Sequence, residues 1–417
     1  MYSPKIVENS VRKISDASGI RLKRYTTDAC IELADHIDSA YSKETKQYTR
    51  DLSREELDFI RNEQLMCSVD FLYWAKRYAR IKTKRPGKPE RYCPWDSQLM
   101  LHELMVGLED TCEARRDGIM ICNLKARQLG MSTVYEMVLS HKAFFTHGFN
   151  GLLAADDPNQ SEFLFGMMER IYDNLPEFLR PLRTFHVKGA QMVFRSMDSM
   201  IIVQHGNLRA DIGRGKTVHG VHLSELEKWE NTEQIDSGLM PALPRLPTTM
   251  AFFESTGEYR GSWWHAFCND SMDEANRFTM FFVPWYAEPN TYSKPAPSGW
   301  KPDELSKAHA RQVERDSPKW MRGRTCQLSR DQLFFWEFTR NEYAKNGKTG
   351  MFFCEYASSP QEAFRSANSS VFTYETIEFL RSKSSNPKAY EVRGKGIDHE
   401  SIRMEQIKTI KSRKRKV

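Results

Sequence analysis

The sequence predicts an α/β fold in which a parallel sheet is flanked by helices. Short apolar runs suited to buried strands recur through the middle of the chain and alternate with helix-like stretches. This alternation is typical of a parallel sheet, whose functional edge lies at the carboxyl ends of its strands. Several of these runs end in polar residues, which places candidate functional side chains at that edge. A smaller helical subdomain is expected to follow the sheet.

Length and composition are those of a globular protein. The chain has 417 residues, of which 40% are hydrophobic and 12% aromatic, and this length allows a large core. No apolar run approaches the ~18 residues of a membrane span, and the chain start lacks the apolar stretch of a secretory signal. Eight cysteines without a C-x-x-C pair predict reduced intracellular thiols rather than disulfides or a zinc site.

Four parts are predicted along the chain: an N-terminal helical segment (1–66), a sheet-containing core (67–290), a lid or linker subdomain (291–387) and a basic tail (388–417). The tail carries ten Lys/Arg and four Asp/Glu, which leaves 51 residues of each sign in the rest of the chain. A basic tail is a candidate contact for nucleic acid, and a solvated terminus is the alternative.

Before the sheet, the sequence predicts helices and one hairpin. Ser53 and Glu56 have the spacing of a capping box at a helix start. An aromatic-rich helix is expected over residues 70–78, and Pro86-Gly87 marks a hairpin turn in the basic segment that follows. Another helix is expected to begin between Pro94 and Asp96.

Five strands and a hairpin are predicted in the core. The strands are expected at 119–124, 151–155, 218–223, 249–253 and 278–283, and the hairpin at 185–205. The hairpin is indicated by its alternation of apolar and polar residues. The other segments are continuous apolar runs, as in strands that are buried on both faces.

The stretch IMICNLKARQLGMST joins the first strand to a helix through a short polar loop. Strand, loop and helix in this order are the layout of a P-loop, where backbone N–H groups and a helix N-terminus hold phosphates. In the pattern G-x-x-x-x-G-K-[ST], Gly130 takes the second glycine, Ser132 the metal-binding hydroxyl and Met131 the place of the lysine. Lys125 stands at the first-glycine position, from which an ammonium reaches the β/γ-phosphates, and Arg127 adds a second cation. An ordinary basic turn is the alternative.

Two further residues are candidates for nucleotide chemistry. Gln98 lies in the first turn of the helix before the P-loop, and a glutamine amide can read the adenine edge; a plain surface glutamine is the alternative. Glu225 follows a strand, where a carboxylate orients and deprotonates the attacking water. One strand intervenes between the P-loop and this Ser224-Glu225 pair, which suits the RecA-like branch of P-loop proteins. Ser224 stands where Asp is usual, so we expect it to reach Mg²⁺ through water.

Four stretches in this order resemble the large terminase subunit of tailed bacteriophages, the ATPase that pumps DNA into the procapsid. They are KARQLGMST, GRGKTVHGVHLSELEKW, FFESTGEYRGSWWHAF and SSPQEAFRSANSSVF, and together they cover roughly residues 71–380. The resemblance implies a RecA-like (ASCE) P-loop NTPase fold and a deviant Walker A motif with its lysine at the front, which matches Lys125. It also implies that Glu225 is the catalytic carboxylate and that Glu254-Ser255-Thr256 couple hydrolysis to DNA movement.

The same resemblance implies ATP and Mg²⁺ as ligands. The residues expected at the nucleotide are Gln98, Lys125, Ala126, Arg127, Gln128, Leu129, Gly130, Met131, Ser132 and Thr133. Ser132 and, through water, Ser224 are expected to hold the metal. Implied partners are double-stranded DNA, the small terminase subunit and the portal protein, with a homo-oligomeric ring and no membrane. The implied location is the cytoplasm of the infected bacterial host, and transiently the procapsid.

Large terminases usually continue into an RNase H-like nuclease, whereas only about thirty residues follow Lys388. We therefore expect no nuclease activity from this chain. Arg214, flanked by Gly213 and Gly215, is a candidate arginine that acts on the neighbouring subunit of a ring; a basic turn before a strand is the alternative, and Arg127, Arg209 and Arg260 are rivals. A helicase-like translocase and a non-hydrolysing ATP-binding scaffold remain alternative functions, because both Walker motifs deviate.

Overall fold

The structure, a computed structural model, describes most of the chain up to residue 365. The described residues are 25–83, 85–187, 190–206 and 217–365, with the backbone of 390–391 and 408–409. Met1–Ala367 form one compact unit and Asn368–Val417 a second. In the second unit, β13 (Tyr390–Glu391) and β14 (Lys408–Thr409) pair as antiparallel strands.

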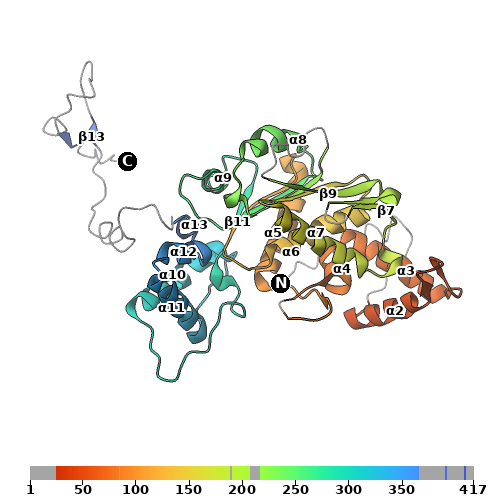
Figure 1. The fold of residues 1–417 in the computed structure, drawn as a ribbon, viewed down its shortest axis with the longest axis horizontal. Helices are drawn as coiled ribbons and strands as arrows, with labels where there is room; N and C mark the ends of the chain where they lie inside the picture. Colours follow the sequence, from red (N-terminus) through yellow and green to blue (C-terminus); the bar gives the residue numbers. More distant parts are fainter. Residues whose placement is uncertain are drawn as a thin grey trace, which may run out of the picture. The chain divides into compact units, whose positions relative to one another are not determined.

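An eight-stranded sheet lies at the centre of the first unit (Figure 1). Its strands in spatial order are β12 (Thr279–Val283), β5 (Ile119–Lys125), β11 (Met250–Ser255), β10 (Gly220–Ser224), β6 (Asn150–Ala155), β9 (Ser199–His205), β8 (Gln191–Phe194) and β7 (Arg183–Val187). The strands from β12 to β9 are parallel, and β8 and β7 continue the sheet as antiparallel strands. The predicted α/β fold with a parallel sheet is thereby confirmed.

The strand order brings the predicted site residues together. β11 lies between β5 and β10, although it follows both in the sequence, so one strand separates the P-loop strand from the strand that ends in Ser224. Because these strands are parallel, their carboxyl ends meet at one edge of the sheet. Lys125, Ser224 and Glu254 therefore come from three adjacent strand ends.

Helices cover both faces of the sheet (Figure 1). One face carries α6 (Met131–Phe145) and α7 (Pro158–Asp173), and the other carries α8 (Met240–Ala242) and α9 (Trp263–Met272). On the first face Tyr135 of α6 stacks on Phe252 of β11, with ring centroids 4.6 Å apart. On the second face Trp264 of α9 is buried in the core. β5, β10 and β11 are buried at every position, which explains their continuous apolar runs.

The elements before the sheet are α2 (Thr27–Ser39), α3 (Arg54–Val69), α4 (Phe71–Tyr78), α5 (Asp96–Arg115) and the short hairpins β1–β2 (Tyr41–Ser42, Gln47–Tyr48) and β3–β4 (Arg80–Ile81, Glu90–Arg91). The predicted capping box of Ser53 and Glu56 is present at the start of α3. The predicted hairpin turn at Pro86-Gly87 lies between β3 and β4, and α5 begins at Asp96 as predicted.

A helical subdomain follows the sheet and consists of α10 (Glu304–Trp320), α11 (Arg330–Lys345), α12 (Thr349–Glu355) and α13 (Pro360–Ala363). Its centre is aromatic: His309 stacks on Trp336 at 4.1 Å and on Trp285 at 6.0 Å between ring centroids. The predicted domain boundaries stay predictions. In the part of the chain that the structure describes, no helix is both long and apolar enough to cross a membrane.

Candidate functional site

The loop between β5 and α6 leaves the N-terminus of α6 uncapped. Gly130 at the N-cap is left-handed (φ 67°), and no side chain of the described residues caps the helix there. Asp157 and Ser262, in contrast, cap α7 and α9. Gln128 is also left-handed (φ 56°), a strained conformation for a residue other than glycine. Uncapped N–H groups at a helix N-terminus are suited to bind an anion such as a phosphate.

Gln98 holds this loop in place. Its Nε2 donates to the carbonyl of Gly130 at 2.9 Å, and its Oε1 accepts from the N–H of Trp95 at 3.0 Å and the hydroxyl of Tyr92 at 3.1 Å. A Cβ on Gly130 would lie 2.8 Å from Gln98 Nε2, so the contact requires a glycine. Because Gln98 is buried and bonded within the protein, its contact with adenine stays a prediction.

Met131 occupies the lysine position of the standard P-loop pattern and is buried in the core. Leu129 is buried as well, and the N–H of Ala126 donates to the carbonyl of Val283 in β12 at 2.9 Å. These residues anchor the loop from below. Met131 is therefore explained by packing, and a substitution that shortens it would leave a cavity.

Arg127 and Thr133 contact other elements. Arg127 Nη1 lies 2.6 Å from Oε1 of Glu355 in α12, and the N–H of Arg127 donates to the carbonyl of Glu355 at 3.0 Å. The hydroxyl of Tyr343 donates to the other Glu355 oxygen at 2.5 Å. Thr133 Oγ1 lies 3.9 Å from Met167 Sδ in α7. The loop is thus joined to the helical subdomain, and the nucleotide contacts of Arg127 and Thr133 stay predictions.

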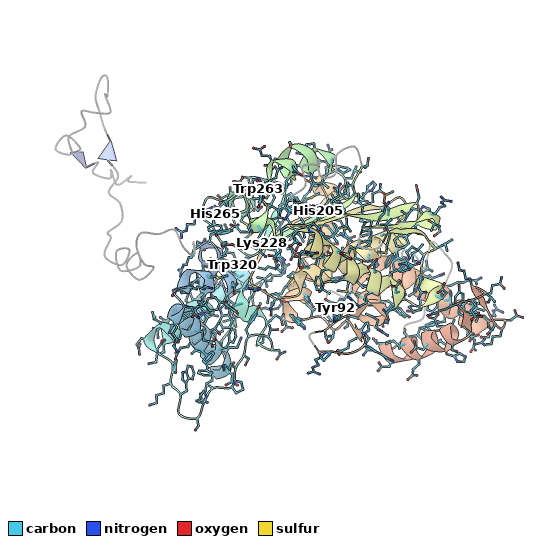
Figure 2. All side chains as sticks on the ribbon, in the orientation of Figure 1. Tyr92, His205, Lys228, Trp263, His265 and Trp320 are labelled. Carbon is cyan, nitrogen blue, oxygen red and sulfur yellow. The ribbon has the colours of Figure 1, made fainter. Side chains whose placement is uncertain are left out.

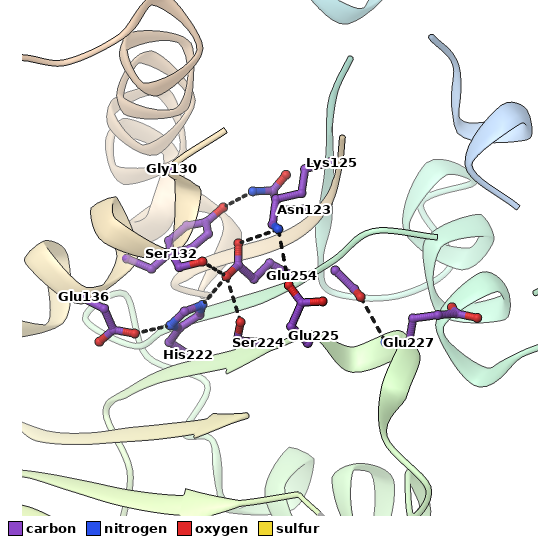
Figure 3. A network of polar contacts seen from close by, with 12 residues as sticks. Asn123, Lys125, Gly130, Ser132, Glu136, His222, Ser224, Glu225, Glu227 and Glu254 are labelled. Carbon is purple, nitrogen blue, oxygen red and sulfur yellow. Dashed lines mark hydrogen bonds and ion pairs between the residues drawn. The ribbon is translucent and has the colours of Figure 1, made fainter. Parts of the chain in front are cut away.

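Lys125 ends β5 with its ammonium facing two carboxylates (Figure 3). Its Nζ lies 3.7 Å from Glu225 Oε1 and 3.9 Å from Glu254 Oε2, and its side chain is only 7% exposed. Burial opposes the charged form, but the carboxylates of Glu254 and Glu225 outweigh it and raise the pKa of Lys125. The loop therefore begins with a fixed positive charge.

Glu225 directly follows β10 in a left-handed conformation (φ 56°, ψ 41°), which costs a residue with a Cβ ~1–3 kcal/mol. Its Oε1 faces Lys125, and its Oε2 lies 3.1 Å from Nζ of Lys228, which Figure 2 labels. The Glu225 side chain is 20% exposed, so water can reach it. The indole N–H of Trp229 donates to the carbonyl of Ser224 at 3.0 Å and holds this strand end.

Glu254 lies in β11, fully buried, at the centre of a polar network (Figure 3). Its Oε1 accepts from Ser132 Oγ at 2.5 Å, from Ser224 Oγ at 3.1 Å and from His222 Nε2 at 3.1 Å. Burial alone would raise the pKa of Glu254, but Lys125 and His222 outweigh it and lower this pKa to about 2. An ionised carboxylate thus lies beside the P-loop serine.

His222 connects Glu254 to a second buried glutamate. Its Nδ1 lies 2.6 Å from Oε1 of Glu136, and neither side chain is exposed. Burial by itself lowers the pKa of His222, whereas Glu136 and Glu254 raise it, to about 9. The charged ring therefore donates both of its N–H groups. Glu136 lies one helical turn after Ser132 in α6, so both residues lie on the same face of the helix.

The strand end after Glu254 contacts the neighbouring loops. Ser255 Oγ accepts the N–H of Glu227 at 3.1 Å. A Cβ on Gly257 would lie 2.5 Å from the carbonyl oxygen of Ala363, so the backbone after Thr256 packs closely against α13. The segment thus links the sheet edge to the helical subdomain. Its role in coupling stays a prediction.

Oxygen donors suited to Mg²⁺ gather at this edge of the sheet: the hydroxyls of Ser132 and Ser224 and the carboxylates of Glu225 and Glu254. Mg²⁺ prefers oxygen ligands and is commonly held by one or two carboxylates together with substrate phosphates. Among the residues that the structure describes, no group of three or more His, Cys, Asp or Glu side chains could hold a metal alone. The donors therefore fit Mg²⁺ that enters with a nucleotide.

The structure brings five predicted site residues together: Lys125, Ser132, Ser224, Glu225 and Glu254. Arg214 and its rival Arg209 lie outside the described residues, so the arginine that acts between subunits stays a prediction.

Sequence reasoning missed four residues of the site: Glu136, His222, Lys228 and Glu355. The signal for His222 and Glu136 is a charged residue inside a buried apolar segment, which requires a partner. The other two have no signal in the sequence, since surface-type Lys and Glu residues are common.

No protein-family model matches the sequence, and no curated protein matches it either. Several solved structures are similar to this chain. They are large terminases of bacteriophages. The ATPase domain from Thermus phage P74-26 is 14% identical, with a TM-score of 0.37, over 62% of this chain and 96% of that domain. The HK97 large terminase is 12% identical, with a TM-score of 0.45, over 78% of this chain and 60% of that protein. The large terminase of another thermophilic bacteriophage is 13% identical, with a TM-score of 0.36, over 46% of each chain. The fold assignment rests on the strand order and not on these scores.

Proposed function

We propose that this chain hydrolyses ATP to move double-stranded viral DNA into a procapsid, as the ATPase part of a phage large terminase. The observation that carries the proposal is the convergence of Lys125, Ser132 and Glu225 beside the uncapped N-terminus of α6. A cation, a metal-binding hydroxyl and a water-orienting carboxylate are the groups that phosphoryl transfer to water requires. The four terminase-like sequence stretches support the link to DNA packaging.

In the proposed reaction, the first N–H groups of α6 and the ammonium of Lys125 bind the phosphates of ATP. Lys125 lies 3.7 Å from Glu225 in the structure, and its turn toward the phosphates frees Glu225 Oε1 to orient water and take its proton. Mg²⁺, when bound, neutralises charge on the phosphate oxygens. Ser132 would hold this metal, with Ser224 acting through water.

Contacts with the helical subdomain support a coupling role for the site. Arg127 pairs with Glu355 of α12, and Gly257 packs against Ala363 of α13. Phosphate binding at the P-loop would compete with Glu355 for Arg127, since both offer anionic oxygens. We infer that α12 and α13 respond to the nucleotide, and that Glu254-Ser255-Thr256 transmit hydrolysis to DNA movement.

The proposed partners are double-stranded DNA, the small terminase subunit and the portal protein, with the chain assembled as a homo-oligomeric ring. The proposed location is the host cytoplasm and, transiently, the procapsid. Arg214 is proposed to act on the site of the neighbouring subunit. A motor that grips the phosphate backbone binds duplexes of any sequence, and its affinity falls steeply with salt because counterions are released. Deletion of residues 408–417 should weaken this binding and leave basal ATP turnover unchanged.

Displacement of a triplex-forming third strand from linear duplex DNA tests the proposal. We expect displacement with ATP, none with a non-hydrolysable analogue, and none by the Glu225→Gln variant. Unwinding of a forked duplex without triplex displacement would instead indicate a helicase-like enzyme. Nucleotide binding without any turnover would indicate an assembly scaffold.

A further inference from the structure

The strand that carries the proposed catalytic glutamate lacks one carboxylate. In P-loop NTPases, Mg²⁺ is held by the P-loop Ser or Thr together with an Asp at the end of the neighbouring strand. Here the residue before Glu225 is Ser224, which is neutral. If nothing replaced the missing charge, the doubly charged metal would face a site with one anion fewer.

The missing carboxylate is present one strand away. Ser224 of β10 and Glu254 of β11 are paired in the parallel register. Ser224 Oγ donates to Glu254 Oε1 at 3.1 Å, and Ser132 Oγ donates to the same oxygen at 2.5 Å. Glu254 therefore contacts both hydroxyls that are expected to serve the metal (Figure 3).

The two oxygens of Glu254 have different surroundings. Oε1 accepts three hydrogen bonds, whereas Oε2 is buried and has no hydrogen-bond partner among the described residues. The cation nearest to Oε2 in the ion pairs of the site is Lys125 Nζ, at 3.9 Å. A buried ionised oxygen without a hydrogen bond is costly and calls for an explanation such as an absent ion.

We propose that Glu254 holds the Mg²⁺ of the bound nucleotide together with Ser132, in place of the aspartate that Ser224 replaces. The inference rests on the proposed function and deepens it, because it moves the metal carboxylate from β10 to β11. His222 and Glu136 then act as positioning residues, since His222 occupies Oε1 and leaves Oε2 for the metal. When Lys125 turns to the phosphates, Mg²⁺ replaces it as the cation beside Oε2.

Binding of Mn²⁺, used in place of Mg²⁺, tests this inference without a measurement of turnover. Free Mn²⁺ is measured by electron paramagnetic resonance while protein is added in the presence of a non-hydrolysable ATP analogue. Loss of a supporting ligand typically weakens metal binding 10–100-fold. We expect Glu254→Gln to weaken Mn²⁺ binding by about tenfold or more, and to leave binding of the analogue in EDTA within about threefold of the wild type.

Two variants control for a purely structural role of Glu254. Glu136→Gln removes a buried glutamate from the far side of His222, away from Ser132, and should change Mn²⁺ affinity by less than about threefold. The double variant Ser224→Asp/Glu254→Ser returns the carboxylate to β10 and should recover Mn²⁺ affinity to within about tenfold of the wild type. A role in pairing Lys125 alone predicts no such recovery.

A smaller loss than tenfold in Glu254→Gln, or no recovery in the double variant, would overturn the inference. If Glu254→Gln does not fold, Glu254→Asp replaces it: this variant keeps the charge but shortens the reach, and it must show the same tenfold loss. A wild type that binds no manganese nucleotide would instead contradict the proposed function. Wild type and Glu254→Gln with equal Mn²⁺ affinity would contradict this inference alone.

Discussion

The ammonium of Lys125 lies 3.7 Å from the carboxylate of Glu225 although the two residues end different strands, β5 and β10. This ion pair is 7% and 20% exposed on its two side chains, so it lies at the border between core and solvent. A phosphate that enters here meets the cation of the pair and releases the carboxylate. The relationship explains how a lysine at the front of the P-loop serves the same site as a glutamate two strands away.

Lys125→Ala should abolish most ATP turnover. Removal of one preorganised charge-stabilising group typically costs ~10²–10³-fold in rate. The measurement is steady-state phosphate release, with circular dichroism to show that the variant is folded. Met131→Leu is the control, because it keeps the volume of a buried side chain and should cost less than ~1.5 kcal/mol. An active Lys125→Ala beside an inactive Met131→Leu would show that the loop register is wrong.

The Arg127–Glu355 pair should contribute measurable coupling between the P-loop and α12. Its atoms lie 2.6 Å apart, and the Arg127 side chain is 57% exposed, so we expect a coupling energy of about 0.5–1 kcal/mol. A double-mutant cycle with Arg127→Ala and Glu355→Ala, followed by urea unfolding, measures it. If the ATP analogue recruits Arg127 to the phosphates, the coupling disappears in its presence. Equal coupling with and without the analogue would leave Arg127 as a structural residue.

Gly130→Ala should weaken nucleotide binding as well as stability. Gly130 is left-handed, and a Cβ there would lie 2.8 Å from Gln98 Nε2. Gly148→Ala is the matched control, since Gly148 is also left-handed (φ +71°) but would place its Cβ within 4 Å of no neighbouring atom in the described structure. Both variants should lose about 1 kcal/mol of unfolding free energy. Only Gly130→Ala should weaken binding of a fluorescent ATP analogue; equal binding by the two variants would refute a role for the Gln98–Gly130 contact.

The buried His222 should make stability depend on pH at the alkaline side. Glu136 and Glu254 face its two ring nitrogens and raise its pKa from 6.5 to about 9. A raised pKa stabilises the folded state fully below pH 6.5, and this contribution is lost as the pH rises through 9. The slope attributable to His222 is therefore negative, up to ~1.4 kcal/mol per pH unit in that window.

Urea unfolding of the wild type and His222→Gln between pH 6 and pH 9.5 measures this slope. The difference in unfolding free energy between the two proteins should shrink as the pH rises. Parallel curves would show that His222 is neutral in the folded protein. At the acid end, the lowered pKa of Glu254 predicts that its contribution is lost as the pH falls from 4.5 toward 2.

The fold was largely predictable because each strand of the core is a local apolar run. The segments at 119–124, 151–155 and 218–223 lie within one or two residues of the observed β5, β6 and β10. Strand order is less accessible from one sequence, since it depends on contacts between distant segments. The sequence therefore predicts that Lys125, Ser132 and Glu225 share an edge, but not that Glu254 reaches Ser132.

The buried network around His222 was not predictable from local pattern. His222 lies inside an apolar strand, and its partners Glu136 and Glu254 come from α6 and β11. A hydropathy pattern marks such residues only as exceptions. Glu355 is separated from Arg127 by most of the sheet in the sequence, so their ion pair follows from the tertiary fold alone.

ATP turnover with and without linear duplex DNA, measured on wild type and Glu225→Gln, tests the central claim most directly. Glu227→Gln is the matched control, because Glu227 accepts hydrogen bonds from Tyr259 and Ser262 and does not contact Lys125 in the described ion pairs. We expect duplex DNA to stimulate the wild type, Glu225→Gln to lose ~10²–10⁴-fold in turnover while it still binds ATP, and Glu227→Gln to retain activity within a few-fold. Near-normal turnover by Glu225→Gln would contradict the account.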